Sequence, residues 1–131
     1  MLDILVRLEA IKSFAKDIHY TANGDEFYGI HLMMDRIAGG LDDFSDAIKE
    51  TVFLGNNTLP PSSKEILKYS LAYIPDIMSM KENLLALRIL IGETISVLDK
   101  IEATRAENSL YDNIAQDLKL KLGLLNRTLN D

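Results

Sequence analysis

The sequence contains no cysteine among its 131 residues. This absence excludes a disulfide framework, thiolate zinc sites and thiol catalysis, and it favours a reducing compartment, so we expect a cytoplasmic protein. No apolar run reaches the roughly 18 residues that a membrane span needs, and we expect no membrane association. The first residues, Met1 to Arg7, lack the basic-then-apolar order of a secretory signal peptide.

Positive charge is also scarce. Lysine and arginine number 14 against 20 aspartates and glutamates, which gives a formal net charge of −6. Such a charge argues against a protein that holds DNA through its overall field. With 131 residues, 47% of them hydrophobic, the chain has enough apolar side chains for one core and no room for a second. We therefore expect a single domain over residues 1–131.

Apolar side chains recur every three or four residues through most of the chain, which predicts amphipathic helices. Turn residues at 21–25 and 55–63 separate the first helices, and the Ser-x-x-Glu sequences at 62–65 and 79–82 are typical of helix starts. The predicted helices cover about 3–21, about 25–53 with a stop at Gly55, Ser62 to before Pro75, Ser79 to about 98, and Asn108 or Ser109 to about 129.

This order of elements predicts an all-α fold, a ferritin-like four-helix bundle with a short extra helix in the crossover between the second and third long helices. A crossover of about 25 residues lets the chain traverse the bundle. The third long helix is therefore expected to run parallel to the second.

Two histidines and three carboxylates on the first two predicted helices form a candidate set of metal ligands. His19 and His31 flank the turn at 21–25, so an antiparallel hairpin brings them close. The pairs His31/Asp35 and Asp46/Glu50 both have i, i+4 spacing, and eleven steps of about 100° place both pairs within a roughly 100° arc of the helix 25–53. The axial distance between Asp35 and Asp46, about 16 Å, is nevertheless too long for one shared metal ion.

A second copy of the chain would resolve this separation. An antiparallel copy related by a two-fold axis places Asp46 and Glu50 beside His31 and Asp35 of the first chain, in two equivalent sites. The midpoint falls at Gly40, next to Gly39, and two glycines inside a helix cost about 1 kcal/mol each relative to alanine. We interpret the pair as a close approach of two backbones, and the alternative is a kink that splits the helix. Imidazoles with carboxylates suit iron or another divalent transition metal.

The residues of this segment resemble the ferroxidase motif of the Dps family, the DNA-binding proteins from starved cells, also called miniferritins. The five ligand types stand at separations of 12, 4, 11 and 4 residues, and the helix pattern extends the resemblance over nearly the whole chain. The motif consists of His19, Tyr20, Gly24, Phe27, His31, Asp35, Asp46 and Glu50.

The resemblance implies a hollow dodecamer that binds Fe(II) in di-iron or mono-iron sites between two-fold-related subunits, oxidises it with hydrogen peroxide or oxygen, and stores Fe(III) mineral. His19, His31 and Asp35 would then be catalytic metal ligands from one subunit, and Asp46 and Glu50 would come from its partner. Such a protein protects against oxidative damage.

Further features concern cation entry and DNA. Relatives admit cations through acidic pores. The candidates by location are Glu107, Asp112 and Asp117. Tyr20 stands where the family usually has tryptophan, and tyrosine can also quench a radical. The chain is shorter than is usual and lacks the lysine-rich arm through which many relatives bind DNA, so we expect little or no DNA binding.

Other functions stay open at the level of sequence. The main alternative is a non-catalytic helical interaction protein whose acidic face is only solvated. Bacterioferritin-type and rubrerythrin-type centres are disfavoured, because they require Glu-x-x-His motifs and this sequence has none.

Overall fold

The computed structural model describes residues 1–130, and within this range every regular element is helical. The prediction of an all-α fold is therefore confirmed. The elements are α1 (Leu2–Thr21), a 3₁₀ turn (Gly24–Glu26), α2 (Phe27–Ala38), α3 (Leu41–Ile48), a π-helical turn (Lys49–Leu54), α4 (Ser63–Ser70), a 3₁₀ turn (Leu71–Tyr73), α5 (Met80–Asp99) and α6 (Arg105–Leu129).

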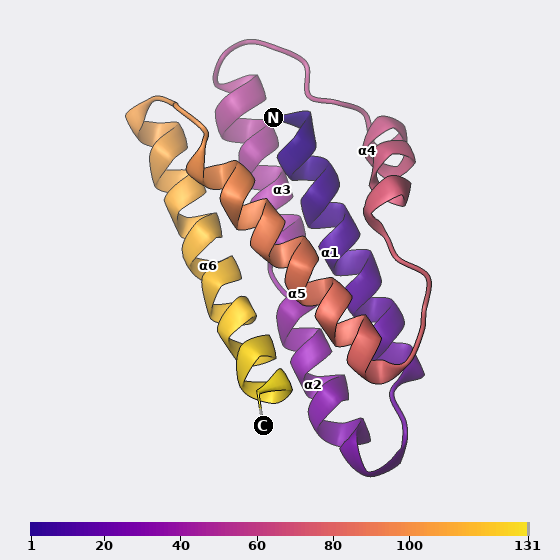
Figure 1. Ribbon diagram of the computed structural model, residues 1–131. Coiled ribbons are helices and arrows are strands. Elements are labelled where there is room, and N and C mark those ends of the chain that lie inside the picture. The colour runs from indigo at the N-terminus through magenta and orange to yellow at the C-terminus, as the bar shows by residue number, and fades with distance from the viewer. Residues whose placement is uncertain (131) are drawn as a thin grey trace.

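The helices form a bundle of two antiparallel pairs (Figure 1). In this view α1 runs downward, α2 and α3 return upward beside it, α5 runs upward and α6 returns downward. α1 packs against α2 and α5, while α6 packs against α5 and touches α2 and α3. The long connection after α3 crosses the top of the bundle and carries α4 down the outer side of α1. α5 therefore runs parallel to α2 and α3, as the crossover length predicted.

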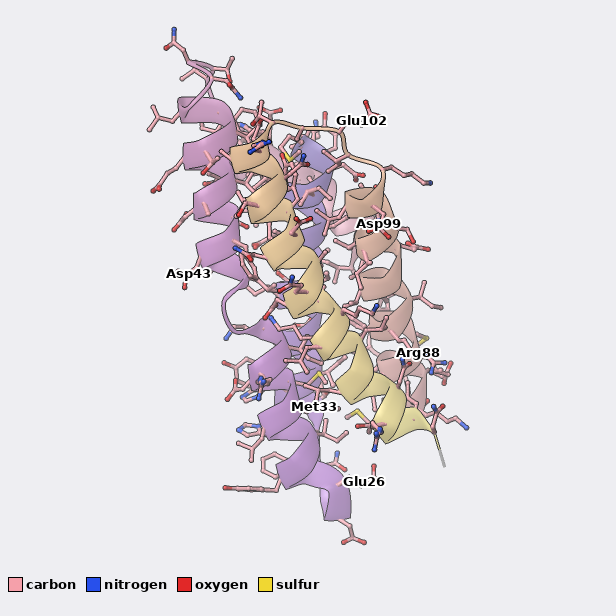
Figure 2. All side chains as sticks on the ribbon, turned by 90° about the vertical axis from the view of Figure 1, so that its left-hand side faces the viewer. Glu26, Met33, Asp43, Arg88, Asp99 and Glu102 are labelled. Carbon is pink, nitrogen blue, oxygen red and sulfur yellow. The ribbon has the colours of Figure 1, made fainter. Side chains whose placement is uncertain are left out.

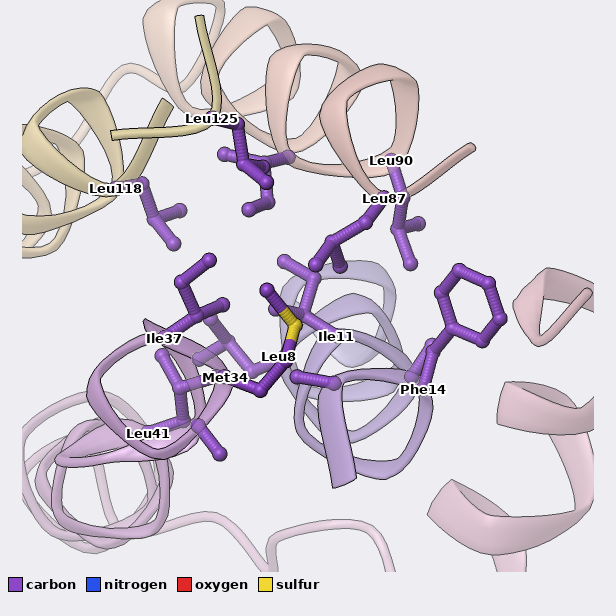
Figure 3. Packing of buried hydrophobic residues seen from close by; sticks show 14 of the residues in the cluster. Leu8, Ile11, Phe14, Met34, Ile37, Leu41, Leu87, Leu90, Leu118 and Leu125 are labelled. Carbon is purple, nitrogen blue, oxygen red and sulfur yellow. The ribbon is translucent and has the colours of Figure 1, made fainter. Parts of the chain in front are cut away.

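One apolar stripe from each long helix meets in the centre of the bundle (Figure 3). Burial of a side chain of this kind contributes about 1.5–3 kcal/mol to folding. The central side chains, each at most 1% exposed, include Leu8, Ile11, Met34, Ile37, Leu41, Leu87, Ile91, Leu118 and Leu125. The periodicity thus predicted the faces on which the helices pack.

Side-chain caps fix three helix starts. The hydroxyl of Ser62 accepts a hydrogen bond from the backbone N–H of Glu65, and Ser79 does the same for Glu82, which confirms both predicted starts. The last helix begins at Arg105, so the predicted start at Asn108 or Ser109 is wrong. Thr104 and Glu107 form a reciprocal capping box there, and the hydrogen bond from Thr104 holds the pKa of the Glu107 carboxyl below its ordinary value.

The predicted helix 25–53 is broken at Gly39–Gly40, where Figure 2 shows a loop between its two halves. Gly40 has φ +81°, in the left-handed region that disfavours a side chain. The prediction that one continuous helix face carries both the His31/Asp35 and the Asp46/Glu50 pair is therefore wrong, and the alternative of a kink is confirmed. Backbone conformation accounts for the glycine, so the pair no longer supports a dimer axis.

The second half of this segment ends in a π-helical turn. The N–H of Gly55 donates to the carbonyl of Glu50 over 2.8 Å, which closes the turn. A Cβ on Gly55 would collide with the carbonyl oxygen of Thr51. The predicted stop at Gly55 is confirmed, and the close approach to Thr51 explains why this position requires a glycine. In residues 1–130, no helix has the combined length and apolar character that crossing a membrane requires.

Candidate metal centre

The first two long helices bring His19 and His31 together. His19 lies in the last turn of α1, and His31 lies in the second turn of α2. Between the helices, Ala22 has an extended backbone that ends α1, and Gly24, with φ +74°, opens the 3₁₀ turn that leads into α2. The antiparallel hairpin expected from the sequence is confirmed.

The two imidazole rings lie face to face. Their centroids are 3.6 Å apart and their planes differ by 24°. Each ring also contacts the backbone of the other residue: His19 Nδ1 is 2.9 Å from the carbonyl oxygen of His31, and His31 Nδ1 is 3.4 Å from that of His19. These reciprocal contacts fix the orientation of both rings.

The partners of the rings define their tautomer. A carbonyl oxygen only accepts hydrogen bonds, so Nδ1 carries the hydrogen and donates it in both histidines. In the neutral ring, Nε2 then holds the free lone pair. A histidine that donates Nδ1–H to a backbone carbonyl is the usual arrangement of a metal ligand. In both histidines Nε2 is therefore the ring nitrogen left to bind a cation.

Asp35 adds a carboxylate to the histidine pair. Its Oδ1 lies 3.4 Å from His19 Nδ1, and one ligand atom from each of His19, His31 and Asp35 lies within 4.8 Å of the others. The Asp35 side chain is 56% exposed, whereas that of His19 is only 11% exposed. The carboxylate can thus reorient toward an arriving ion, while the buried imidazole stays fixed.

Aromatic side chains surround the histidines. Phe27 stacks on the His31 ring at 4.9 Å, and Tyr20 meets the His19 ring edge-on at 5.0 Å. Tyr20 is 76% exposed. The phenol therefore stands beside the candidate centre at the surface, and the two histidines are shielded from much of the solvent.

The structure brings together three of the five predicted ligands and leaves two apart. Within residues 1–130, His19, His31 and Asp35 form the one group of three or more such residues close enough to share an ion. Asp46 in α3 and Glu50 in the π-helical turn are exposed and lie beyond the Gly39–Gly40 break. A single chain therefore assembles three of the five predicted ligands.

Two of the three candidate pore residues have partners within the chain. Glu107 accepts a hydrogen bond from the Asn56 amide over 3.2 Å, besides its role in the capping box. Asp117 lies 2.7 Å from the Lys121 ammonium. Asp112 is exposed on α6. Glu107 and Asp117 thus have structural roles that location alone did not predict.

Sequence reasoning missed Lys121. It lies within the last helix, directly before Leu122 of the predicted apolar stripe, yet it is only 2% exposed. Its ammonium donates a hydrogen bond to the carbonyl of Gly39 over 2.8 Å. The i, i+4 spacing to Asp117 was the only sequence signal of a paired lysine.

Comparison of the chain with protein-family models, with curated proteins and with solved structures finds no match. The fold and the site together define an all-helical bundle with a preassembled His–His–Asp group.

Proposed function

We propose that this protein is a miniferritin-like ferroxidase. In this proposal the substrate Fe(II) binds to His19, His31 and Asp35 of one chain, and Asp46 and Glu50 of a second copy complete the site. Iron is oxidised there and stored as Fe(III) mineral inside a closed shell of twelve chains, located in the cytoplasm.

The observation that carries the proposal is the preassembled histidine pair. Two imidazoles from different helices each face a backbone carbonyl with Nδ1 and keep a lone pair at Nε2, and one ligand atom of each ring lies within 4.8 Å of one from Asp35. The Oδ1 atom of Asp35 lies 3.4 Å from His19 Nδ1, so a carboxylate is within reach of the histidine pair. Nitrogen and oxygen ligands together suit Fe(II) and related transition metals.

The order and direction of the helices support the same proposal. Two antiparallel pairs joined by a long crossover, with the third long helix parallel to the second, is the connectivity of ferritin-like bundles (Figure 1). The short helix α4 lies in that crossover. The exposure of Asp46 and Glu50 leaves both carboxylates accessible to a second chain.

The chemistry follows from the ligand types. Imidazoles bind the ferrous substrate, and carboxylates hold the harder ferric product. Two Fe(II) ions supply the two electrons that hydrogen peroxide takes up with two protons to give two water molecules. Because both electrons pass at one site, no hydroxyl radical is released, and peroxide is consumed harmlessly.

Iron oxidation tests the proposal directly. We expect light scattering to report an assembly near twelve times the mass of the chain, and ferric absorbance to rise rapidly when Fe(II) and peroxide are added. His31→Ala and Glu50→Ala should each abolish the rapid phase while helix content and assembly stay unchanged. The matched control is Asp43→Ala, since this exposed carboxylate on α3 points away from the bundle (Figure 2).

The same measurements separate the proposal from the alternative of a helical interaction protein. A monomer without ferric product contradicts the ferroxidase and favours the alternative. An oxidation rate in His31→Ala or Glu50→Ala equal to that of the parent shows that the assigned ligands are wrong.

DNA binding is expected to be weak or absent. A shell of chains that each carry a net charge of −6 repels phosphates. A gel shift of supercoiled DNA at physiological salt and low micromolar protein concentration tests this, and a retarded band would contradict it.

A further inference from the structure

The break between α2 and α3 leaves a backbone group that the chain must satisfy elsewhere. In a continuous helix, the carbonyl of Gly39 would accept the N–H of Asp43. The helix is interrupted at Gly40, so this bond is replaced by one from the Lys121 ammonium of α6, 2.8 Å away. A side chain 82 positions later in the sequence therefore caps the carboxyl end of α2.

The Lys121 side chain is buried and has a carboxylate partner on its own helix. It is 2% exposed, and the carboxylate of Asp117, one turn earlier on α6, lies 2.7 Å from its ammonium. A buried ammonium is costly unless it is paired and hydrogen-bonded, and here it has both partners. The hydrogen bond between Lys121 and Gly39 therefore lies in the protein interior and not at the surface.

A second lysine holds the other side of the break. Lys12 of α1 contacts Asp42 in the first turn of α3 over 2.9 Å and Glu9 of its own helix over 2.8 Å. Burial alone would lower the pKa of the Lys12 ammonium, yet the hydrogen bonds to both carboxylates raise it above its ordinary value. The first turn of α3 is therefore tied to α1, as the last turn of α2 is tied to α6.

The break lies next to the candidate metal centre. Asp35 lines a shallow hollow of about 320 Å³ together with Lys12, Gly39, Gly40 and Asp42. Its own backbone carbonyl accepts the N–H of Gly39 over 2.9 Å. A change of angle at Gly40 would therefore move α3, with Asp46 and Glu50, relative to the α2 segment that carries His31 and Asp35.

We propose that Lys121 is a positioning residue, which sets the angle between α2 and α3 and so places the Asp46/Glu50 half of the site relative to the His19/His31/Asp35 half. This inference rests on the proposed function, because positioning matters only where both halves meet across two chains. Lys121 itself touches no substrate. Its contact holds one glycine hinge in one geometry, and the assembled site requires that geometry.

The two halves should respond differently to loss of Lys121. In Lys121→Met, the His19/His31/Asp35 group stays on the packed α1/α2 hairpin, so its affinity for one Co(II) ion should stay within about twofold of the parent. Fe(II) oxidation, which needs both halves aligned, should fall by about tenfold or more. The control Lys119→Met, an exposed lysine on the same helix, should leave both unchanged.

Spin labels measure the hinge without reference to activity. The chain has no cysteine, so Tyr28→Cys on α2 and Asp43→Cys on α3 give one unique label pair, and both positions are exposed. Labelled protein is diluted with unlabelled protein, so only distances within one chain contribute. We expect a narrow distance distribution in the parent and in Lys119→Met, and a broader or shifted one in Lys121→Met.

The outcomes separate this inference from the proposed function. If the parent neither binds Co(II) nor oxidises Fe(II), the proposed function fails, whatever the label distances show. If the parent is active and Lys121→Met keeps its distance distribution or its oxidation rate, the role of Lys121 is refuted. Should circular dichroism show that Lys121→Met does not fold, Asp117→Asn, which removes the carboxylate that holds the ammonium, is read by the same criteria.

Discussion

The rings of His19 and His31 stack at 3.6 Å, and each Nδ1 faces the backbone carbonyl of the other residue. The two residues are 12 positions apart and lie on opposite sides of a turn, so this arrangement joins the end of α1 to the beginning of α2. It makes the hairpin and the candidate metal-binding group a single structural unit.

The first prediction concerns the tautomer of these rings. Because both Nδ1 atoms face carbonyl oxygens, the neutral rings should carry their hydrogen on Nδ1 and leave Nε2 free. Nitrogen–proton correlation spectra of the ring resonances distinguish the two tautomers, and addition of Zn(II) should shift the Nε2 signals most. Hydrogen on Nε2 of both neutral rings would show that the lone pairs face the wrong way for the proposed site.

The second prediction concerns the hinge glycine. Gly40→Ala should lower the free energy of unfolding by about 1–2 kcal/mol, because an L side chain is disfavoured at φ +81°. Gly40→Asn should cost less, since asparagine tolerates this conformation. Urea unfolding measures both.

The matched control is Gly29→Ala, at an exposed helical position whose added Cβ meets nothing within 4 Å. It should raise the free energy of unfolding by about 0.5–1 kcal/mol. Equal effects of alanine at positions 29 and 40 would contradict the conformational explanation of Gly40.

The third prediction concerns the π-helical turn. Gly55→Ala should destabilise the protein by about 1–3 kcal/mol, because the new Cβ meets the carbonyl oxygen of Thr51 and the backbone must shift. Gly92→Ala, in the middle of α5 with open space around it, should not destabilise the protein. Thermal and urea unfolding report both, and a neutral Gly55→Ala would mean that the turn is not sterically fixed.

The fourth prediction concerns Tyr111. Burial, with the nearby Glu107 charge as a second cause, raises the pKa of its phenol to about 12 from an ordinary value of 10.0. The folded state therefore favours the protonated phenol, whose stabilising effect is fully present below pH 10 and is lost as the pH rises toward 12.

Ultraviolet absorbance of the phenolate measures this titration. The difference between the curves of the parent and Tyr111→Phe should be centred near pH 12. A difference centred near pH 10 would show that the phenol is solvated in the folded state.

Periodicity predicted the helices and their buried faces because a helix that packs on one side must repeat apolar residues every three or four positions. Periodicity did not reveal the break at Gly39–Gly40, because the apolar repeat continues across it. Leu41 and Ile48 are buried as a continuous stripe requires, so the pattern passes through the break without a visible change. The start of α6 was also missed, although Thr104 and Glu107 have the spacing of a capping box.

The proximity of His19 and His31 was predictable, because residues on both sides of a short turn between two antiparallel helices must approach each other. Its ring stacking and its carbonyl partners were not, since these depend on side-chain rotation within the folded hairpin. The burial of Lys121 could not be predicted from the sequence at all. A lysine is exposed by default, and its burial follows only from the position of a carbonyl that the break at Gly40 leaves unpaired.

Local sequence by itself determined the helices, their caps and the faces that they bury, because these properties depend on neighbours within a few turns of one chain. Tertiary structure decided the angle at Gly40, the burial of Lys121 and the set of candidate metal ligands that one chain brings together. The physical reason is that each of these depends on contacts between segments distant in sequence, whose geometry exists only after the helices have packed.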